Sequence, residues 1–220
     1  HEQVADPATI DRIMRDGAGF RMGPFELLDL TGIDVNYPAS TYIYEGYHHD
    51  PRLKTWPRHE LMVHAGLLGR KTGQGFFSYA EGAAFAPSPP APDVPVRLGV
   101  RIADPGPQWD AVLAATGDAQ GDDAVLVAPV GEDCTTACHR LGLDPVKTVA
   151  VDLTAIERRH LTVMSAPGGG ETARRVADWL RGTGFAVEVI ADSPGFVLQR
   201  ILCMIANLGC ELAQIGIGSP

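Results

Sequence analysis

Two cysteines and a histidine lie close together in the sequence and could, by residue type, bind a metal ion. Cys134 and Cys138 are four positions apart, so on a helix they would share one face, and His139 follows directly. A zinc site needs further Cys or His ligands, and no second pair follows at a suitable spacing. The four cysteines also lack the spacing of a disulfide framework. We therefore expect reduced, partly buried thiols and no metal site.

A run of glycines, Gly168 to Gly170, lies between an expected strand and an expected helix, where a nucleotide phosphate could bind. The run does not match the pattern G-x-G-x-x-G, and it comes near the end of the strand pattern, whereas a dinucleotide loop follows the first strand. The segment after the first expected strand, "ADPGPQWD", has no such fingerprint. We interpret the run as a connection and expect no cofactor bound to this chain.

Helical signals dominate residues 1–79. Asp6 and Pro7 suit a helix start, Gly23 and Pro24 open another helix, and Asp34 could cap a third. Gly73 and Gly75 then supply turn conformations that a side chain would hinder. The expected helices cover residues 7–15, 24–30, 34–46 and 57–68.

A change in composition predicts a domain boundary. Residues 80–95 are rich in Ala and Pro without apolar periodicity, which indicates an extended linker. Short β-branched runs alternating with helical stretches follow over residues 96–192 and predict a mainly parallel sheet with helices on its faces, in a Rossmann-like arrangement. The expected strands cover residues 96–103, 123–128, 148–153, 161–165 and 186–191.

A long helix is expected over residues 193–217, within a last segment that runs to residue 220. Ser193 would cap it and Pro194 would be its first residue. Its apolar face needs a partner, because an isolated amphipathic helix is not stable in water. The apolar residues at helical spacing are Val197, Ile201, Met204, Leu208 and Leu212.

Charge and composition exclude several classes of partner. The net charge of −9 argues against nucleic acid and anionic membranes, because these need clustered Lys and Arg. Arg200, Asn207 and Glu211 would be costly inside a bilayer, so we expect no membrane span. No signal peptide is present, which favours a cytoplasmic protein, and His1 is not a native start, so we expect a fragment.

Two stretches, "GAGFRMGPFELLDLTGIDV" from Gly17 to Val35 and "PRHELMVHAGLLGRKTGQGFFSY" from Pro57 to Tyr79, resemble the C-terminal helical domain of the 3-hydroxyacyl-CoA dehydrogenases. The later "DSPGFVLQR" is similar to the segment with which that same domain begins. The resemblance implies a helical domain over residues 1–79 that lacks its first long helix, then a degenerate Rossmann-like domain, then the first helix of a second helical domain.

The same resemblance implies a tandem of two copies, of which this chain covers one repeat length. Its missing partner would be an N-terminal NAD domain. Because residues 193–217 are the kind of element that residues 7–79 lack, we expect this helix to cover the helical domain, within one chain or by exchange in a homodimer. We favour the homodimer.

The catalytic residues that the resemblance implies are absent. The family uses a His supported by a Glu, with NAD as hydride acceptor. Val151 or Asp152 stands at the His position, Thr154 at a following Asn, and Val163 at the Glu. His160 lies nearby, but we expect a surface or edge histidine. An Asn that holds the substrate thioester is replaced by Gln199, a degenerate position, so the second copy looks structural.

The first stretch keeps the family's features at Phe20, Met22, Gly23 and Pro24, which the resemblance places near the acyl cleft. A helix start and a core residue are the alternative interpretation of this segment. Lys71 could meet a CoA phosphate, although a solvated turn lysine is the safer assumption.

We therefore expect the C-terminal part of an NAD-dependent 3-hydroxyacyl-CoA dehydrogenase that is inert alone and meets its acyl-CoA substrate through the full enzyme. The alternative is a non-catalytic dimerisation and substrate-lid module.

Overall fold

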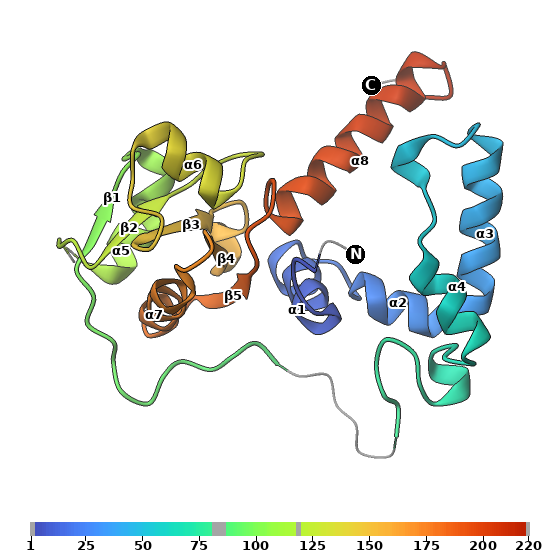
Figure 1. Cartoon of the computed structure of the whole chain (residues 1–220), viewed down its shortest axis with the longest axis horizontal. Helices are drawn as coiled ribbons and strands as arrows, with labels where there is room; N and C mark the ends of the chain where they lie inside the picture. Colours follow the sequence, from blue (N-terminus) through green and yellow to red (C-terminus); the bar gives the residue numbers. More distant parts are fainter. Residues whose placement is uncertain (1–2, 81–86, 118–119, 219–220) are drawn as a thin grey trace. The chain divides into compact units, whose positions relative to one another are not determined.

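The computed structural model describes residues 3–80, 87–117 and 120–218. Across these residues it contains eight α-helices and one five-stranded sheet, so the chain is a mixed α/β protein. The chain forms two compact units (Figure 1). We call Asp6–Arg15 with Phe20–Pro87 the helical unit, and Gln3–Ala5, Asp16–Gly19 and Ser88–Pro220 the sheet unit. Residues 81–86 of the predicted linker and residues 219–220 of the predicted last segment lie outside the described residues.

The helical unit contains all four predicted helices. In it α2 packs against α1 and α3, and α3 packs against α4. After α1 the chain continues as a π-helical turn, Ile13–Gly17. The fourth helix ends earlier than predicted, because Gly66 adopts a φ of +71° that stops the helix. The helices are α1 Pro7–Arg12, α2 Pro24–Thr31, α3 Ile33–Gly46 and α4 Pro57–His64.

In the helical unit the predicted Asp6 cap is confirmed, and the predicted Asp34 cap is wrong. Asp6 caps α1, since its Oδ1 accepts a hydrogen bond from the Thr9 amide at 2.9 Å. Asp34 does not cap α3; it lies in the first turn, and Gly32 is the cap residue. Gly32 has a φ of +96° because α2 ends and α3 begins on the same residue. The Asn36 side chain fixes this corner by donating to the Gly32 carbonyl at 2.8 Å.

The five predicted strands form one sheet in the order β1-β2-β3-β4-β5. Three of the four pairings are parallel, as predicted, and β3 pairs with β4 antiparallel. Only residues 153–159 connect β3 to β4, which is too short for the crossover that parallel neighbours need. The strands are β1 Val100–Ile102, β2 Ala124–Val127, β3 Thr148–Asp152, β4 His160–Ser165 and β5 Ala186–Ile190.

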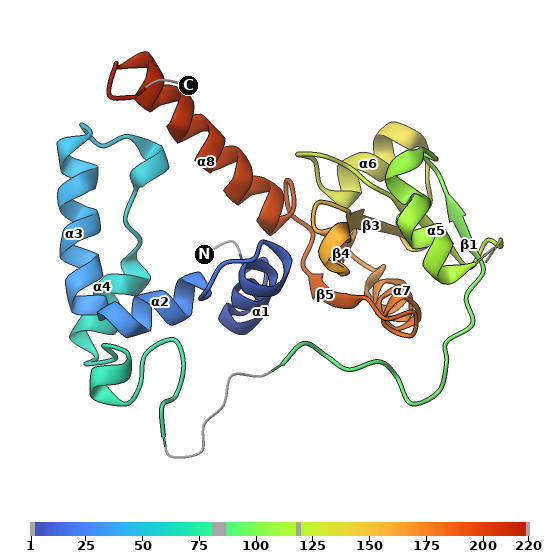
Figure 2. The same ribbon diagram turned by 180° about the vertical axis from the view of Figure 1, so that it is seen from behind.

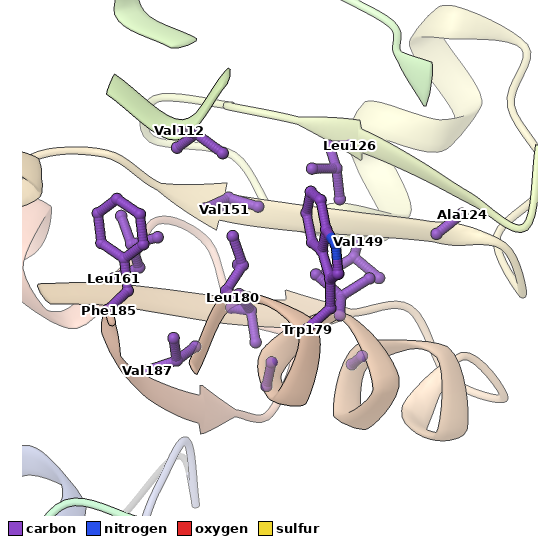
Figure 3. Close-up of a cluster of buried hydrophobic side chains, with 14 of the residues drawn as sticks. Val112, Ala124, Leu126, Val149, Val151, Leu161, Trp179, Leu180, Phe185 and Val187 are labelled. Atoms are coloured by element: carbon purple, nitrogen blue, oxygen red, sulfur yellow. The ribbon is translucent and has the colours of Figure 1, made fainter. Parts of the chain in front are cut away.

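Helices cover the sheet. The buried core lies between the sheet and the pair α5, Asp110–Thr116, and α7, Gly170–Arg181. Another helix, α6, Cys134–Leu141, packs against β3 and β4. Its buried side chains do not belong to the cluster of buried hydrophobic residues that forms this core. Figure 3 shows the cluster, which includes Val112, Leu126, Val149, Val151, Leu161, Trp179, Leu180 and Val187.

The last helix, α8, runs from Val197 to Gln214 and extends away from the sheet (Figure 2). It starts later than predicted, because Ser193 is not its cap. The Ser193 hydroxyl instead donates to the Gly195 carbonyl at 2.8 Å, and Gly195 turns the chain with a φ of +78°. Phe196 is the cap residue. In the part of the chain that the structure describes, no helix has the length and apolar character needed to cross a membrane.

Candidate functional site

The side chain of Gln199 joins the ends of two strands to the first turn of α8. Its Nε2 donates to the Pro129 carbonyl oxygen and to Oδ1 of Asp152, both at 3.2 Å. Its Oε1 accepts a hydrogen bond from the Gly131 amide at 3.2 Å. Pro129 and Gly131 follow β2, and Asp152 ends β3. We call these residues, together with Thr154, the Gln199 cluster.

Asp152 is the buried member of the Gln199 cluster, with 3% of its surface exposed. Its Oδ1 also accepts from the Thr154 amide at 3.1 Å and from the Thr154 hydroxyl at 2.5 Å. Both N–H groups of the Gln199 amide are used, so none is left to donate to a ligand. The structure thus brings together three positions that the resemblance singles out, Asp152, Thr154 and Gln199, as an internal hydrogen-bond network.

A second carboxylate, Asp192, occupies the N-terminus of α6. Its Oδ1 accepts from the Cys134 amide at 2.7 Å, and its Oδ2 accepts from the Thr135 amide at 3.1 Å and hydroxyl at 2.5 Å. A negative charge is favourable at a helix N-terminus. This carboxylate therefore takes the place that an anionic ligand would need there. The sequence did not predict the contact between Asp192 and α6, because the segment "DSPGF" lies far from α6 along the chain.

The two thiols of α6 are buried, as is typical of unreactive cysteines. Cys134 and Cys138 are buried and free, and burial is the main cause that raises the pKa of Cys134 to about 12. At neutral pH Cys134 is therefore a neutral thiol and a poor nucleophile. Of the residues that the structure describes, no group of three His, Cys, Asp or Glu side chains is placed to hold a metal ion.

Gly23 and Pro24 form the start of α2. Asp11 accepts from the Phe25 and Glu26 amides at 2.9 and 2.8 Å and so satisfies the first turn. A Cβ on Gly23 would lie 2.1 Å from the Asp11 Cγ, so only glycine fits beside this carboxylate. Burial is the main cause that raises the Asp11 pKa, and the two amide hydrogen bonds oppose it.

Two other predicted site residues of this segment, Phe20 and Met22, differ in exposure. Phe20 is 44% exposed, and Met22 is half-buried. Lys71 pairs with the Asp34 carboxylate, whose pKa is lowered chiefly by this hydrogen bond. The lysine charge is therefore partly neutralised within the unit, which favours the role of a turn residue over that of a free phosphate ligand.

Comparison with known proteins identifies the family. Residues 1–79 match the family described as "3-hydroxyacyl-CoA dehydrogenase, C-terminal domain". The chain is 32% identical over 222 aligned positions to the 3-hydroxyadipyl-CoA dehydrogenase of Escherichia coli K12, covering 99% of this chain and 43% of that protein. Residues 1–79 thus match the C-terminal domain of the 3-hydroxyacyl-CoA dehydrogenases, and the chain along almost its whole length is similar to one such enzyme.

Two further relatives agree with this similarity. A probable 3-hydroxybutyryl-CoA dehydrogenase of Deinococcus radiodurans is 41% identical over 78 residues, which are 36% of this chain and 28% of the relative. The crystal structure of 3-hydroxybutyryl-CoA dehydrogenase from Escherichia coli K12 superposes with a TM-score of 0.77 and 28% identity, over 99% of this chain and 43% of that one. The chain thus spans less than half the length of both Escherichia coli proteins.

The cofactor that this family uses does not fit the sheet unit. A dinucleotide site has a glycine loop after the first strand and presents a helix N-terminus to the pyrophosphate. After β1 the chain instead carries Asp104, whose Oδ2 accepts from the Ala128 amide at 3.3 Å, and α5 starts with Asp110. Two carboxylates would repel a pyrophosphate at this place. The residues present therefore do not form a dinucleotide site.

The positions that the resemblance assigns to the family's His and Glu lie in or beside the sheet core. Val151 and Val163 are register partners and belong to the buried cluster. Figure 3 labels Val151 within it. His160 begins β4, as predicted, but it is 2% exposed, so the expected surface or edge position is wrong. The reason is the strand order, which puts β4 inside the sheet, and the packing of Gly17, where a Cβ would lie 3.1 Å from the His160 Nδ1.

A buried carboxylate that the sequence reasoning missed fixes the end of the helical unit. Asp29, on α2, accepts from the Phe76 and Phe77 amides at 2.9 Å each and from the Tyr79 hydroxyl at 3.0 Å. Gly73 has the expected turn conformation, with a φ of +75°. Gly75 has another role: a Cβ there would lie 2.2 Å from the Asp29 Oδ1. Gly75 itself was the signal in the sequence. The sequence analysis explained this glycine by its backbone freedom, whereas the structure explains it by the close approach of the Asp29 carboxylate.

A surface pocket lies apart from all these residues. It has a volume of about 420 Å³ between β1, the end of α5 and Trp179 of α7. Val112, Leu113 and Arg101 are among the residues that line it. None of the predicted site residues lines it.

Proposed function

We propose that this chain is part of an NAD-dependent 3-hydroxyacyl-CoA dehydrogenase, which oxidises a 3-hydroxyacyl-CoA to the 3-oxoacyl-CoA in fatty-acid or phenylacetate-type degradation. The single observation that carries the proposal is the 32% identity to a 3-hydroxyadipyl-CoA dehydrogenase along 99% of the chain. The TM-score of 0.77 over the same share of the chain supports it. The NAD site and the catalytic His and Glu belong to a part of the enzyme outside this chain.

The two units have different roles in this proposal. The helical unit is the family's C-terminal helical domain without its first long helix, and Phe20 and Met22 belong to the surface that closes the acyl cleft. The sheet unit is a degenerate Rossmann-like domain, followed by the first helix of a second helical domain. The hydrogen-bonded Gln199 and the carboxylates at Asp104 and Asp192 support a structural role for it.

The isolated chain is then inactive. Its test is a measurement of NADH formation from NAD and 3-hydroxybutyryl-CoA at micromolar protein. The expected result is a rate equal to that of the blank. Turnover that disappears in His160→Ala and persists in the exposed control His64→Ala would show that the sheet unit holds a working base, and the division of roles would be abandoned.

The alternative is a non-catalytic dimerisation and substrate-lid module. The exposure of Phe20 favours it, because an exposed aromatic side chain beside a helix start can cover an acyl group. Titration of the chain with acetoacetyl-CoA in a calorimeter tests it. A lid binds acetoacetyl-CoA without turnover and loses affinity in Phe20→Ala, whereas equal heats for Phe20→Ala and wild type would exclude the lid.

A further inference from the structure

Three consecutive residues that lead into β4, Arg158, Arg159 and His160, make different contacts. Arg159 is the anchor. Its guanidinium donates to two carbonyl oxygens of the turn before β5, at 2.6 and 3.1 Å, and lies 4.4 Å from the ring centroid of the buried Phe185. Its φ of +54° is one that residues with a side chain rarely adopt. The anchored Arg159 thereby fixes the positions of its two neighbours, Arg158 and His160.

Both neighbours lie against a segment from the start of the chain, Asp16–Gly19, which we call the glycine turn and which belongs to the sheet unit. Gly17 is buried, and a Cβ there would lie 3.1 Å from the His160 Nδ1. A Cβ on Gly19 would overlap with the Arg158 guanidinium. The two glycines therefore let the backbone of this turn lie directly against the two side chains.

A second attachment lies on the other side of α1. The Val4 carbonyl oxygen accepts a hydrogen bond from the Ala191 amide, just after β5, at 2.7 Å. Gln3–Ala5 also belongs to the sheet unit. The sheet unit thus holds the chain both before and after α1.

The glycine turn is joined directly to the segment that the resemblance places near the acyl cleft. Gly19 turns the chain with a φ of +76°, and the next residue, Phe20, donates its amide to the Met14 carbonyl oxygen at 3.2 Å. Met14 is part of the π-helical turn, a feature that is frequent at functional sites. The backbone path into Phe20 is therefore set by the glycine turn.

We propose that His160 and Arg158 are positioning residues for the acyl cleft, because they hold the glycine turn and thereby place Phe20 and Met22 beside the acyl group. This inference rests on the proposed function, which assigns these two residues to the cleft. Neither His160 nor Arg158 takes part in the reaction. His160 is 2% exposed and packs against backbone, so a substrate does not reach it. The sheet unit would in this way act on substrate affinity without holding a cofactor.

Steady-state kinetics of the full-length dehydrogenase tests the proposal, with KM measured separately for 3-hydroxybutyryl-CoA and for NAD. In Arg158→Ala and in His160→Ala the KM for the acyl-CoA should rise about tenfold, because part of the apolar contact with the acyl group is lost. The KM for NAD and the kcat should stay within about twofold of wild type. A merely structural loss would reduce the folded fraction, which lowers the apparent kcat and leaves both KM values unchanged.

Two exposed residues of the sheet unit supply matched controls. Arg174→Ala and His139→Ala remove the same side chains from the surfaces of α7 and α6. Neither should change the KM for the acyl-CoA. A rise in these controls equal to that in Arg158→Ala and His160→Ala would contradict the role of the glycine turn.

A double-mutant cycle tests the contact itself. Gly17→Ala adds a Cβ that presses on His160, so it should also raise the KM for the acyl-CoA about tenfold. His160→Ala vacates the space that this Cβ needs. The KM of the double variant should therefore lie about tenfold below the value that two independent effects predict. Additive effects would show that the two residues do not act through one contact.

The possible failures are distinguishable. A wild-type enzyme without dehydrogenase activity would refute the proposed function before any variant is measured. An active wild type whose Arg158→Ala and His160→Ala variants keep the wild-type KM for the acyl-CoA would overturn this inference alone. A loss of kcat in His160→Ala with a changed pH profile would also overturn it, because His160 would then act on the reaction. If His160→Ala does not fold, the exposed Arg158→Ala carries the test.

Discussion

Replacing Asp29 by Ala removes the carboxylate that closes the helical unit. Three hydrogen bonds are lost, from the Phe76 amide, the Phe77 amide and the Tyr79 hydroxyl. Hydrogen bonds to a charged group contribute about 1.5–3 kcal/mol each, and a buried donor without a partner costs about 1–3 kcal/mol. Because Phe76 and Phe77 are only half-buried, water can reach part of the site. We expect Asp29→Ala to lower the free energy of unfolding of the helical unit by about 3–5 kcal/mol.

Hydrogen exchange measured by NMR reports this loss locally, which is necessary because the chain has two units and need not unfold in one step. In Asp29→Ala the Phe76 and Phe77 amides should exchange at least a hundredfold faster. The control is Glu60→Ala, an exposed carboxylate of α4 that lies 3.9 Å from His64 and should cost less than about 0.5 kcal/mol. If both variants exchange alike, Asp29 is not the residue that holds the segment, and the reasoning fails.

Four further outcomes are expected. Gly23→Ala should destabilise the helical unit by about 2–4 kcal/mol, measured by urea unfolding, because its Cβ would displace the Asp11 carboxylate that caps α2; a neutral effect would contradict the close approach. Gln199→Ala should cost about 2–3 kcal/mol, seen as a lower melting temperature, because three hydrogen bonds of about 1 kcal/mol each are lost; an unchanged melt would show that the cluster carries no stability. Asp192→Asn should cost about 1–2 kcal/mol, seen as a lower melting temperature, by losing the charge at the α6 N-terminus; an unchanged melting temperature would show that this charge does not stabilise α6. Tyr79 has its pKa raised to about 12, first by burial and then by the hydrogen bond to a carboxylate, so its contribution is complete below pH 10 and is lost as the pH rises from 10 to 12; a phenol that titrates near 10 in the difference spectrum against Tyr79→Phe would refute this.

Local signals in the sequence predicted most elements of the fold. The start of α1 was predictable because its cap residue, Asp6, directly precedes Pro7, the first residue of the helix. The strands were predictable because a run of β-branched residues marks each of them in the local sequence. The start of α3 was missed because Asn36 and Gly32 make a corner shared with α2, and Asp34 is an equally good cap by type. The direction of β4 could have been predicted from the short connection alone.

The candidate site was less predictable, because its contacts join distant segments. Gln199 meets Asp152 across 47 positions, and Asp192 meets α6 across 58. The resemblance identified Gln199 and Asp152 as altered positions, but residue types alone could not indicate that they bond to each other. The burial of His160 depends on the strand order, which no local pattern encodes.

The most direct test of the structural role of the sheet unit is the turnover number of the dehydrogenase of which we propose this chain to be a part. Wild type and Gln199→Ala would be compared by NADH formation at saturating 3-hydroxyacyl-CoA, with the melting temperature measured on the same samples. We expect a kcat within about twofold of wild type and a lower melting temperature, because the loss of about 2–3 kcal/mol falls on the free energy of unfolding. A hundredfold loss in kcat with an unchanged melting temperature would contradict it, because Gln199 would then act on the reaction.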